Sequence, residues 1–203
     1  ILIIDNGTTE KLKTGSDCVS GKCLQFDVTG DYVSFGNIST FDFSNIEFTI
    51  SGWFKPLSIP SGSDVCGRRA TLFANRDYGY QTVLLNNGKL NTARYTSSSS
   101  AYSIAGNTIL STSTWYYYTM TQNSGNLLLY LNGVLDASIS TTQLVTFYGA
   151  ADFPNMGMQY CGPTAYYFNG LFDDFRIYNA SIPTSQIKEQ YYAGLNSLFI
   201  NGG

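Results

Sequence analysis

Hydrophobic and polar residues alternate along short segments of the chain, with turn-forming residues between the segments. In FTISGWFKP, alternation places Phe48, Ile50 and Phe54 on one face of an extended strand and Trp53 on the other. TWYYYTMTQ alternates in the same way, but both of its faces carry aromatic residues. An aromatic outer face is either a carbohydrate platform or a surface covered by a loop, and the second is the commoner arrangement in a large sandwich.

Segments of this kind recur at short spacing, which favours an all-β sandwich over alternating strands and helices. The pattern predicts strands at 24–28, 32–35, 47–55, 71–74, 81–85, 90–95, 115–121, 127–131 and 168–178. Asn87-Gly88 and Asn132-Gly133 lie between apolar strands and predict two tight hairpins. A short C-terminal helix is predicted from Pro183 to Gly194, where it would plug one end of the sandwich. Residues 97–100 are predicted to form a loop.

The composition limits the classes of function. The chain has 203 residues, which a single all-β domain can fill, and a net charge of −3 with 12% charged residues. No cluster of Lys and Arg is present, so nucleic acid is not an expected partner. No apolar run is long enough to insert into a membrane, and no signal segment is recognisable at the start. We therefore expect a mature or truncated form of the chain.

The four cysteines, Cys18, Cys23, Cys66 and Cys161, suit an oxidising compartment and allow three pairings. Cys18 and Cys23 bracket a tight turn, which favours a local disulfide and leaves Cys66 to pair with Cys161. The chain has no histidine and no Cys-x-x-Cys pair, so a zinc or thioredoxin-type redox site is not expected.

Three Asn-x-Ser/Thr sequons are candidate glycosylation sites, at Asn6, Asn37 and Asn179. Such triplets also arise by chance in a chain rich in Asn, Ser and Thr, so both interpretations stay open.

The segment FNGLFDDFRIYN places two adjacent carboxylates in an otherwise apolar strand. Simple alternation puts Asp173 on the same face as Phe175, and Asp174 on the same face as Arg176. One carboxylate must then point toward a core, where a charge needs a hydrogen bond, an ion pair or a metal. The pair therefore either stabilises the fold or forms part of a functional site.

A candidate glycan site lies in NRDYGYQTVLLNN and the strand that follows it. Sugars stack on exposed aromatic rings and form hydrogen bonds with Asp, Asn and Arg side chains. The residues of those types are Arg76, Asp77, Tyr78, Tyr80, Asn86 and Arg94. The alternative is an ordinary polar hairpin whose tyrosines pack on their neighbours.

Several segments, taken in order, resemble the laminin-G-like, concanavalin A-like jelly-roll domains. They are CLQFDVTGDYVSFGN, FTISGWFKP, NNGKL, LSTSTWYYYTMT, LLLYLNGVLDAS and FNGLFDDFRIYNASIPTSQIKEQYYAG, spanning about Cys18 to Gly194. The resemblance implies one jelly-roll domain over residues 1–203, with two curved antiparallel sheets of six or seven strands each. It also implies an extracellular or cell-surface protein.

The resemblance also bears on the carboxylates. Related jelly rolls often hold a structural Ca²⁺ where an early loop meets the last long strand, and Asp5 with Asp173 or Asp174 occupies comparable positions. The alternative is that Asp173 accepts hydrogen bonds from backbone N–H groups of a crossing loop. Glucanases of this architecture carry a Glu-x-Asp-x-x-Glu run, which this sequence lacks. We therefore expect a domain that is not an enzyme.

The expected function is non-catalytic recognition, with glycans or cell-surface glycoproteins as partners. The alternative is a subunit of an extracellular filament or surface layer. In that case ILII at the N-terminus, or LFI near the C-terminus, would self-associate by adding a strand to a neighbour's sheet, whereas within one domain the two segments would simply pair as edge strands, the commoner arrangement.

Overall fold

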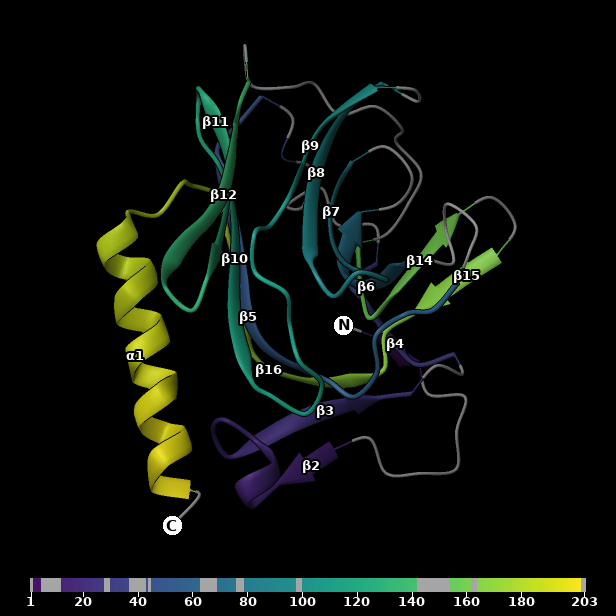
Figure 1. Ribbon diagram of the computed structural model, residues 1–203, viewed down its shortest axis with the longest axis vertical. Helices are drawn as coiled ribbons and strands as arrows, with labels where there is room; N and C mark the ends of the chain where they lie inside the picture. The colour runs from purple at the N-terminus through teal and green to yellow at the C-terminus, as the bar shows by residue number, and fades with distance from the viewer. Residues whose placement is uncertain are drawn as a thin grey trace.

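The computed structural model of the protein describes two layers of β-sheet with one long helix on the outside (Figure 1). The description covers residues 2–4, 12–27, 30–36, 43, 45–62, 69–75, 79–97, 100–141, 154–161 and 164–201.

Among these residues, two seven-stranded sheets face each other, and all paired strands run antiparallel. The first sheet has the order β1 (Leu2–Ile4), β4 (Tyr32–Ser34), β13 (Pro154–Met156), β6 (Arg69–Asn75), β7 (Tyr80–Leu85), β8 (Leu90–Ser97) and β9 (Ser100–Ala105). The second has the order β12 (Val134–Ser140), β11 (Asn126–Leu131), β10 (Tyr116–Gln122), β5 (Phe48–Pro56), β16 (Gly170–Tyr178), β3 (Lys22–Phe26) and β2 (Leu12–Thr14). The expected jelly-roll sandwich is confirmed.

A separate two-stranded ribbon, β14 (Met158–Cys161) with β15 (Thr164–Tyr167), projects from the first sheet. The Gln159 side-chain amide donates to the Gln81 side-chain oxygen at 2.8 Å, and the Phe168 N–H donates to the Gly157 carbonyl at 2.9 Å. Gly157 in turn donates to the Leu72 carbonyl of β6 at 3.0 Å. These bonds hold the ribbon against the first sheet.

The core between the sheets is rich in aromatic side chains. Phe54 and Tyr118 of the second sheet point inward, as their alternation predicts, and pack edge to face with ring centroids 5.7 Å apart. Both hairpins are also found where Asn-Gly predicts them. Gly88, Asn132 and Gly133 adopt the left-handed backbone that such turns need.

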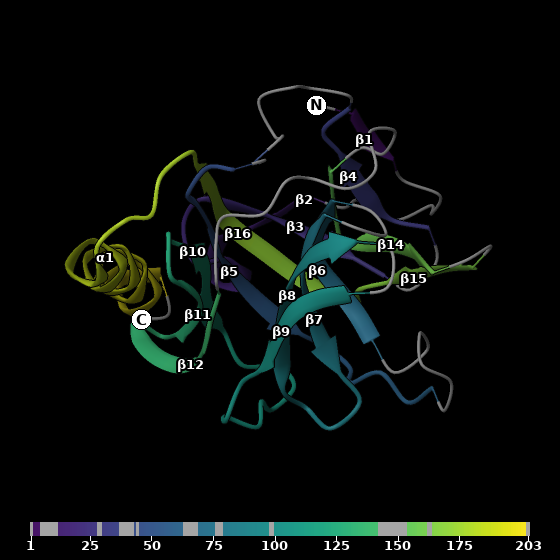
Figure 2. The same cartoon turned by 90° about the horizontal axis from the view of Figure 1, so that it is seen from above.

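Helix α1 (Thr184–Asn201) is longer than predicted and has a different place. It lies along the outer face of the second sheet instead of closing an end, on the side of the molecule opposite the ribbon (Figure 2). Tyr191 of the helix stacks on Trp53 with ring centroids 5.5 Å apart. The helix continues past Gly194, which was predicted to end it. A glycine is needed there because a Cβ would lie 2.3 Å from the indole Nε1 of Trp53.

The helix settles the question of the aromatic outer face. Trp53 and Tyr117 are buried beneath it, so they form no open carbohydrate platform, and the cover is a helix instead of the predicted loop. The Tyr117 hydroxyl donates to Gln190 Oε1 at 2.6 Å, and Gln190 Nε2 donates to the Tyr178 hydroxyl at 2.8 Å. This buried network joins the helix to β10 and β16.

Two other predictions are corrected, and one alternative is resolved. Ser97 ends strand β8 and Ser100 begins strand β9, so both ends of the predicted loop at 97–100 are strand residues, and residues 98 and 99 lie outside the described residues. Residues 198–200, considered as a terminal strand, belong to α1. Leu2–Ile4 pairs with β4 of the same chain at the edge of the first sheet. No helix within the described ranges is long and apolar enough to cross a membrane.

Candidate functional site

Strand β16 contains a bulge at the two adjacent aspartates, and this corrects the simple alternation. Asp173 pairs with Trp53 and Arg176 with Ser51, so two residues of β16 lie opposite the single residue Gly52. Asp174 has a φ of 45°, the left-handed conformation that such an extra residue can adopt. As a result Phe175 points into the core, whereas Asp173 points outward with Trp53.

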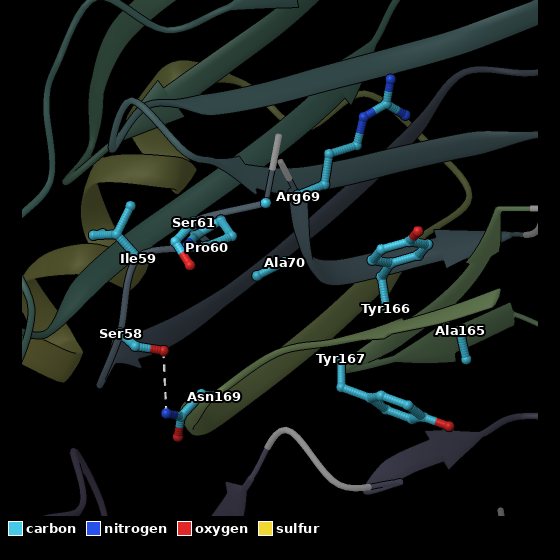
Figure 3. A pocket seen from close by; sticks show the side chains of 11 residues that line it. Ser58, Ile59, Pro60, Ser61, Arg69, Ala70, Ala165, Tyr166, Tyr167 and Asn169 are labelled. Carbon is cyan, nitrogen blue, oxygen red and sulfur yellow. Dashed lines mark hydrogen bonds between the residues drawn. The ribbon is translucent and has the colours of Figure 1, made fainter. Parts of the chain in front are cut away.

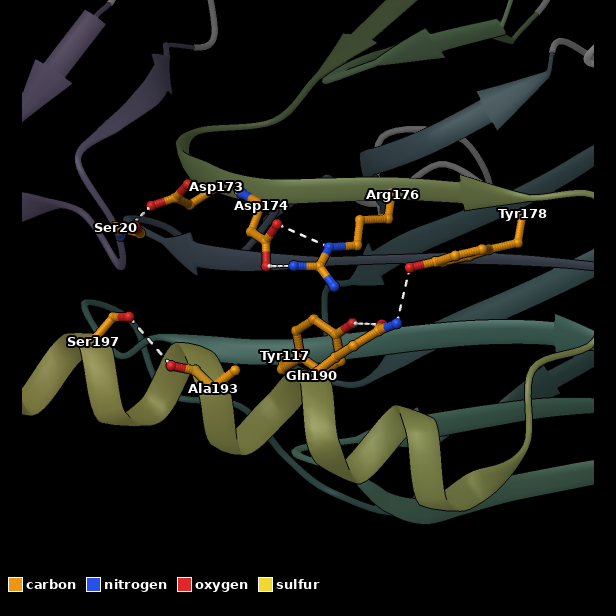
Figure 4. Close-up of polar contacts among 9 residues, drawn as sticks. All are labelled: Ser20, Tyr117, Asp173, Asp174, Arg176, Tyr178, Gln190, Ala193 and Ser197. Atoms are coloured by element: carbon orange, nitrogen blue, oxygen red, sulfur yellow. Dashed lines mark hydrogen bonds and ion pairs between the residues drawn. The ribbon is translucent and has the colours of Figure 1, made fainter.

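Asp173 is satisfied by backbone N–H groups (Figure 4). The N–H of Ser20 donates to one carboxylate oxygen at 2.8 Å and that of Asp174 to the other at 2.7 Å, and Val19 also donates. Burial raises the pKa of Asp173 above 3.8, although these three N–H bonds act in the opposite direction. The carboxylate therefore fastens the turn that follows Cys18 to strand β16.

Asp174 forms a bidentate ion pair with Arg176, with Nε to Oδ1 at 2.9 Å and Nη2 to Oδ2 at 2.7 Å. The two side chains are 30% and 37% exposed, so the pair lies at the surface. The structure thus provides protein partners for both carboxylates that the sequence singles out.

The calcium site stays a prediction. Asp5 lies outside the described residues. Within the described ranges, no cluster of three or more His, Cys, Asp or Glu side chains could hold a metal ion.

Of the six predicted glycan-binding residues, Tyr80, Asn86 and Arg94 lie among the described residues. Arg76, Asp77 and Tyr78 lie outside the described residues. Tyr80 and Arg94 are each 1% exposed, because both point into the core, where the Arg94 guanidinium lies over the Tyr80 ring and donates to the Phe43 carbonyl at 2.8 Å. A sugar cannot reach these two side chains in this arrangement. Asn86 is exposed in the turn between β7 and β8.

The disulfide between Cys18 and Cys23 is present and buried against Leu171 and Trp115, as its tight turn predicts. Cys66 lies outside the described residues, so its pairing with Cys161 stays a prediction. Of the sequon asparagines, Asn6 and Asn37 are also outside. Asn179 is exposed on the bend between β16 and α1, which would allow a glycan to be attached.

A cavity of about 410 Å³ opens beside the ribbon, next to the first residues of β6 (Figure 3). Three segments that are distant in sequence form it: residues 58–62 after β5, the start of β6, and residues 165–169 of β15 and its continuation. The Leu57 N–H donates to the Asn169 carbonyl at 2.9 Å, and Asn169 Nδ2 donates to the Ser58 hydroxyl at 3.1 Å. These bonds fix the segment after β5 to the segment that follows β15.

The lining of this cavity combines an aromatic ring, a guanidinium, an amide and hydroxyls. Arg69 begins β6 and is held by its pairing with Leu85, whose neighbour Asn86 therefore lies at the same end of the sheet. Tyr166 pairs with Gln159 in the ribbon and lies on the same side of β15 as Arg69 (Figure 3). Ser58 and Asn169 supply neutral hydrogen-bonding groups. Such a set of polar groups around an aromatic ring is typical of small-molecule sites.

Tyr167 points to the other side of β15, where further phenols gather. Burial raises the pKa of Tyr32, and the nearby phenols of Tyr160 and Tyr167 raise it further. The pKa of Tyr167 is raised by burial and by Tyr160, which is itself 37% exposed. The ribbon thus carries tyrosines on both faces.

The sequence did not predict this cavity. The adjacent Tyr166 and Tyr167 are visible in the sequence, but their strand was not predicted, because the long strand was expected to start at Phe168. The other walls come from segments whose contact depends on the pairing of whole sheets, which no local pattern encodes.

Solved structures with the same fold include three binding domains. The botulinum neurotoxin serotype D/C binding domain has a TM-score of 0.60 and 18% identity, with 81% of this chain and 41% of that one covered. This chain therefore spans about two fifths of that domain's length. The Ruminococcus gnavus IT-sialidase CBM40, bound to alpha2,3 sialyllactose, has a TM-score of 0.68 and 14% identity, with 83% of this chain and 96% of that one covered.

The third is domain 4 of AbnA, a GH43 extracellular arabinanase from Geobacillus stearothermophilus, in complex with arabinotriose. It has a TM-score of 0.63 and 22% identity, with 91% of this chain and 82% of that one covered. At these identities the likeness concerns the fold. No curated protein matches the chain significantly.

A family model described as the concanavalin A-like lectin/glucanases superfamily matches residues 27–188, which include strands β10, β5 and β16 in the middle of the second sheet, the bulge and the cavity. This match covers most of the 203 residues. The chain therefore belongs to the concanavalin A-like lectin/glucanases superfamily.

Proposed function

We propose that this protein is a non-catalytic recognition domain that binds a glycan in the cavity beside the ribbon. One observation carries the proposal: Tyr166 lies in one cavity with the Arg69 guanidinium, the Asn169 amide and the Ser58 hydroxyl. A sugar ring offers an apolar face, which packs on an aromatic ring, and a rim of hydroxyls, which need such polar partners.

The fold neighbours support a glycan as the ligand. One, the CBM40 of a sialidase, is bound to sialyllactose, and another, domain 4 of an arabinanase, is in complex with arabinotriose. The buried Cys18–Cys23 disulfide suits an extracellular or cell-surface location, since such bonds persist in oxidising compartments.

A binding role also fits the chemistry of the lining. Glycoside hydrolysis needs two carboxyl groups about 5 to 10 Å apart across the scissile bond. Among the described residues that line the cavity there is no Asp or Glu. The cavity can therefore hold a sugar but has no described pair of groups to cleave it.

The proposal is tested by titrating ¹⁵N-labelled protein with neutral and acidic oligosaccharides, including sialyllactose and arabinotriose, and mapping the amide resonances that shift. We expect shifts at residues 58–62, 69–70 and 165–169. Tyr166→Ala should weaken binding about tenfold through loss of the ring contact. The control is Tyr192→Ala, a 57% exposed tyrosine on helix α1, which should bind like the wild type. Shifts confined to other surfaces would overturn the proposed site.

A further inference from the structure

Arg69 is the one charged side chain among the described residues that line the cavity. The rest of the lining consists of hydroxyl, amide, aromatic and aliphatic groups. The chain as a whole carries a net charge of −3, so the charge on the described lining of the cavity is opposite in sign to the overall charge. A site of this sign attracts anions.

Residue Arg69 is partly buried, and none of the described residues forms a hydrogen bond or ion pair with its guanidinium (Figure 3). Arg176, by contrast, is paired with Asp174 through two hydrogen bonds. Withdrawing a cation from water without a counter-charge costs free energy, and an anionic ligand recovers that cost.

We propose that the glycan recognised in this cavity is an acidic sugar whose carboxylate binds Arg69; this rests on the proposed function. The planar guanidinium fork matches a planar carboxylate with two parallel hydrogen bonds. Tyr166 then packs on the sugar ring, and Ser58 with Asn169 binds its hydroxyls.

The lining favours a carboxylate sugar over a polysulfated one. Polymers with many negative charges are bound by several Lys and Arg side chains, because each charge needs a neighbouring cation. Among the described residues of the lining there is one cation, which matches one negative charge. The neutral groups around it match the hydroxyls of the same sugar.

The test compares sugars that differ in their acidic group: glucuronate against glucose, galacturonate against galactose, and sialyllactose against lactose. Affinities are measured by the shifts of cavity amides. We expect at least one acidic member to bind about tenfold or more tightly than its neutral counterpart, as a charge-assisted bidentate pair allows. This preference should weaken between about 0.05 and 0.5 M salt, whereas binding of the neutral sugar should not.

Arg69→Gln should remove the preference while leaving the weaker binding of neutral sugars. Arg69→Lys should keep part of it, because the charge stays but the fork is lost. The matched control is Arg176→Gln, which removes a guanidinium that is already paired with Asp174 and should leave the preference unchanged.

The possible outcomes separate the two claims. If cavity amides shift equally with acidic and neutral sugars and Arg69→Gln changes nothing, acidic recognition is overturned and glycan binding stands. If no sugar of either kind shifts the cavity amides, the proposed function fails, and the acidic preference fails with it.

Discussion

The bulge of β16 and the cavity beside the ribbon both combine charge with aromatic residues, but their charged groups differ in whether they have partners within the protein. At the bulge, Asp173 is held by backbone N–H groups and Asp174 by Arg176. In the cavity, Arg69 has no partner among the described residues. A polar group whose partners lie within the protein stabilises the fold, whereas one without them is available for a ligand.

This difference leads to opposite expectations for mutations. Changes at the bulge and beneath the helix should lower the free energy of unfolding without changing sugar affinity. Changes in the cavity should lower sugar affinity without changing the free energy of unfolding.

The largest effect is expected for Asp173→Ala. The variant leaves the N–H groups of Ser20 and Asp174 without their acceptor and loosens the turn that carries the disulfide. Loss of hydrogen bonds to a charged group should reduce the free energy of unfolding by about 3 kcal/mol. Urea denaturation monitored by tryptophan fluorescence measures this.

The matched control for this variant is Asp174→Asn. Asparagine tolerates the left-handed backbone at this position, so only the surface ion pair is lost. A pair that is 30% and 37% exposed should contribute less than about 1 kcal/mol. Equal losses for the two neighbours would contradict the distinct structural roles assigned here.

The second effect concerns Gln190, which joins the helix to the sheet. In Gln190→Ala the buried Tyr117 hydroxyl loses the acceptor that lies 2.6 Å away in the wild type. Burial raises the pKa of Tyr117 to about 12, so its hydroxyl stays protonated and still needs an acceptor. An unsatisfied buried donor should cost about 2 kcal/mol. Glu189→Ala, at an exposed neighbouring position, should change the free energy of unfolding by less than about 0.5 kcal/mol. A loss of sugar affinity in Gln190→Ala would show that the two regions are coupled.

The two regions also differ in how far the sequence predicts them. Alternation gave the inward and outward faces of β5 and β10, and Asn-Gly gave both hairpins, because strand period and turn chemistry are local. Alternation failed at Asp174, since a bulge depends on the partner strand and on Gly52 leaving room for Phe175. The burial of Arg94 and the cavity itself depend on how distant segments meet, which a single sequence does not show.

The third effect is a loss of sugar affinity in Ser58→Ala. Ser58→Ala removes the hydroxyl that accepts from Asn169, while the backbone bond from Leu57 to Asn169 still holds the loop. We expect sugar affinity to fall about threefold to tenfold, and the free energy of unfolding to change by less than about 0.5 kcal/mol. Ser111→Ala, an exposed serine elsewhere, is the control. A large loss of stability in Ser58→Ala would mean that the cavity wall is a structural element like the bulge.

The smallest effect is a pH dependence of stability that belongs to Asp173. Because burial raises its pKa in the folded protein above 3.8, the folded state binds a proton over a range where the unfolded state has lost it. This contribution to stability is fully present below the unfolded pKa and is lost as pH rises through the folded pKa.

The free energy of unfolding of the wild type, minus that of Asp173→Asn, should therefore decline with rising pH just above 3.8 and then stay constant. Urea titrations of both proteins across this range measure the difference. A difference that increases with pH would mean that the folded protein favours the ionised carboxylate, as a bound cation would. If a chelator then abolished that increase, Asp173 would belong to a calcium site. The carboxylates of the bulge would then not be satisfied by protein groups alone, and the bulge, like the cavity, would bind a ligand.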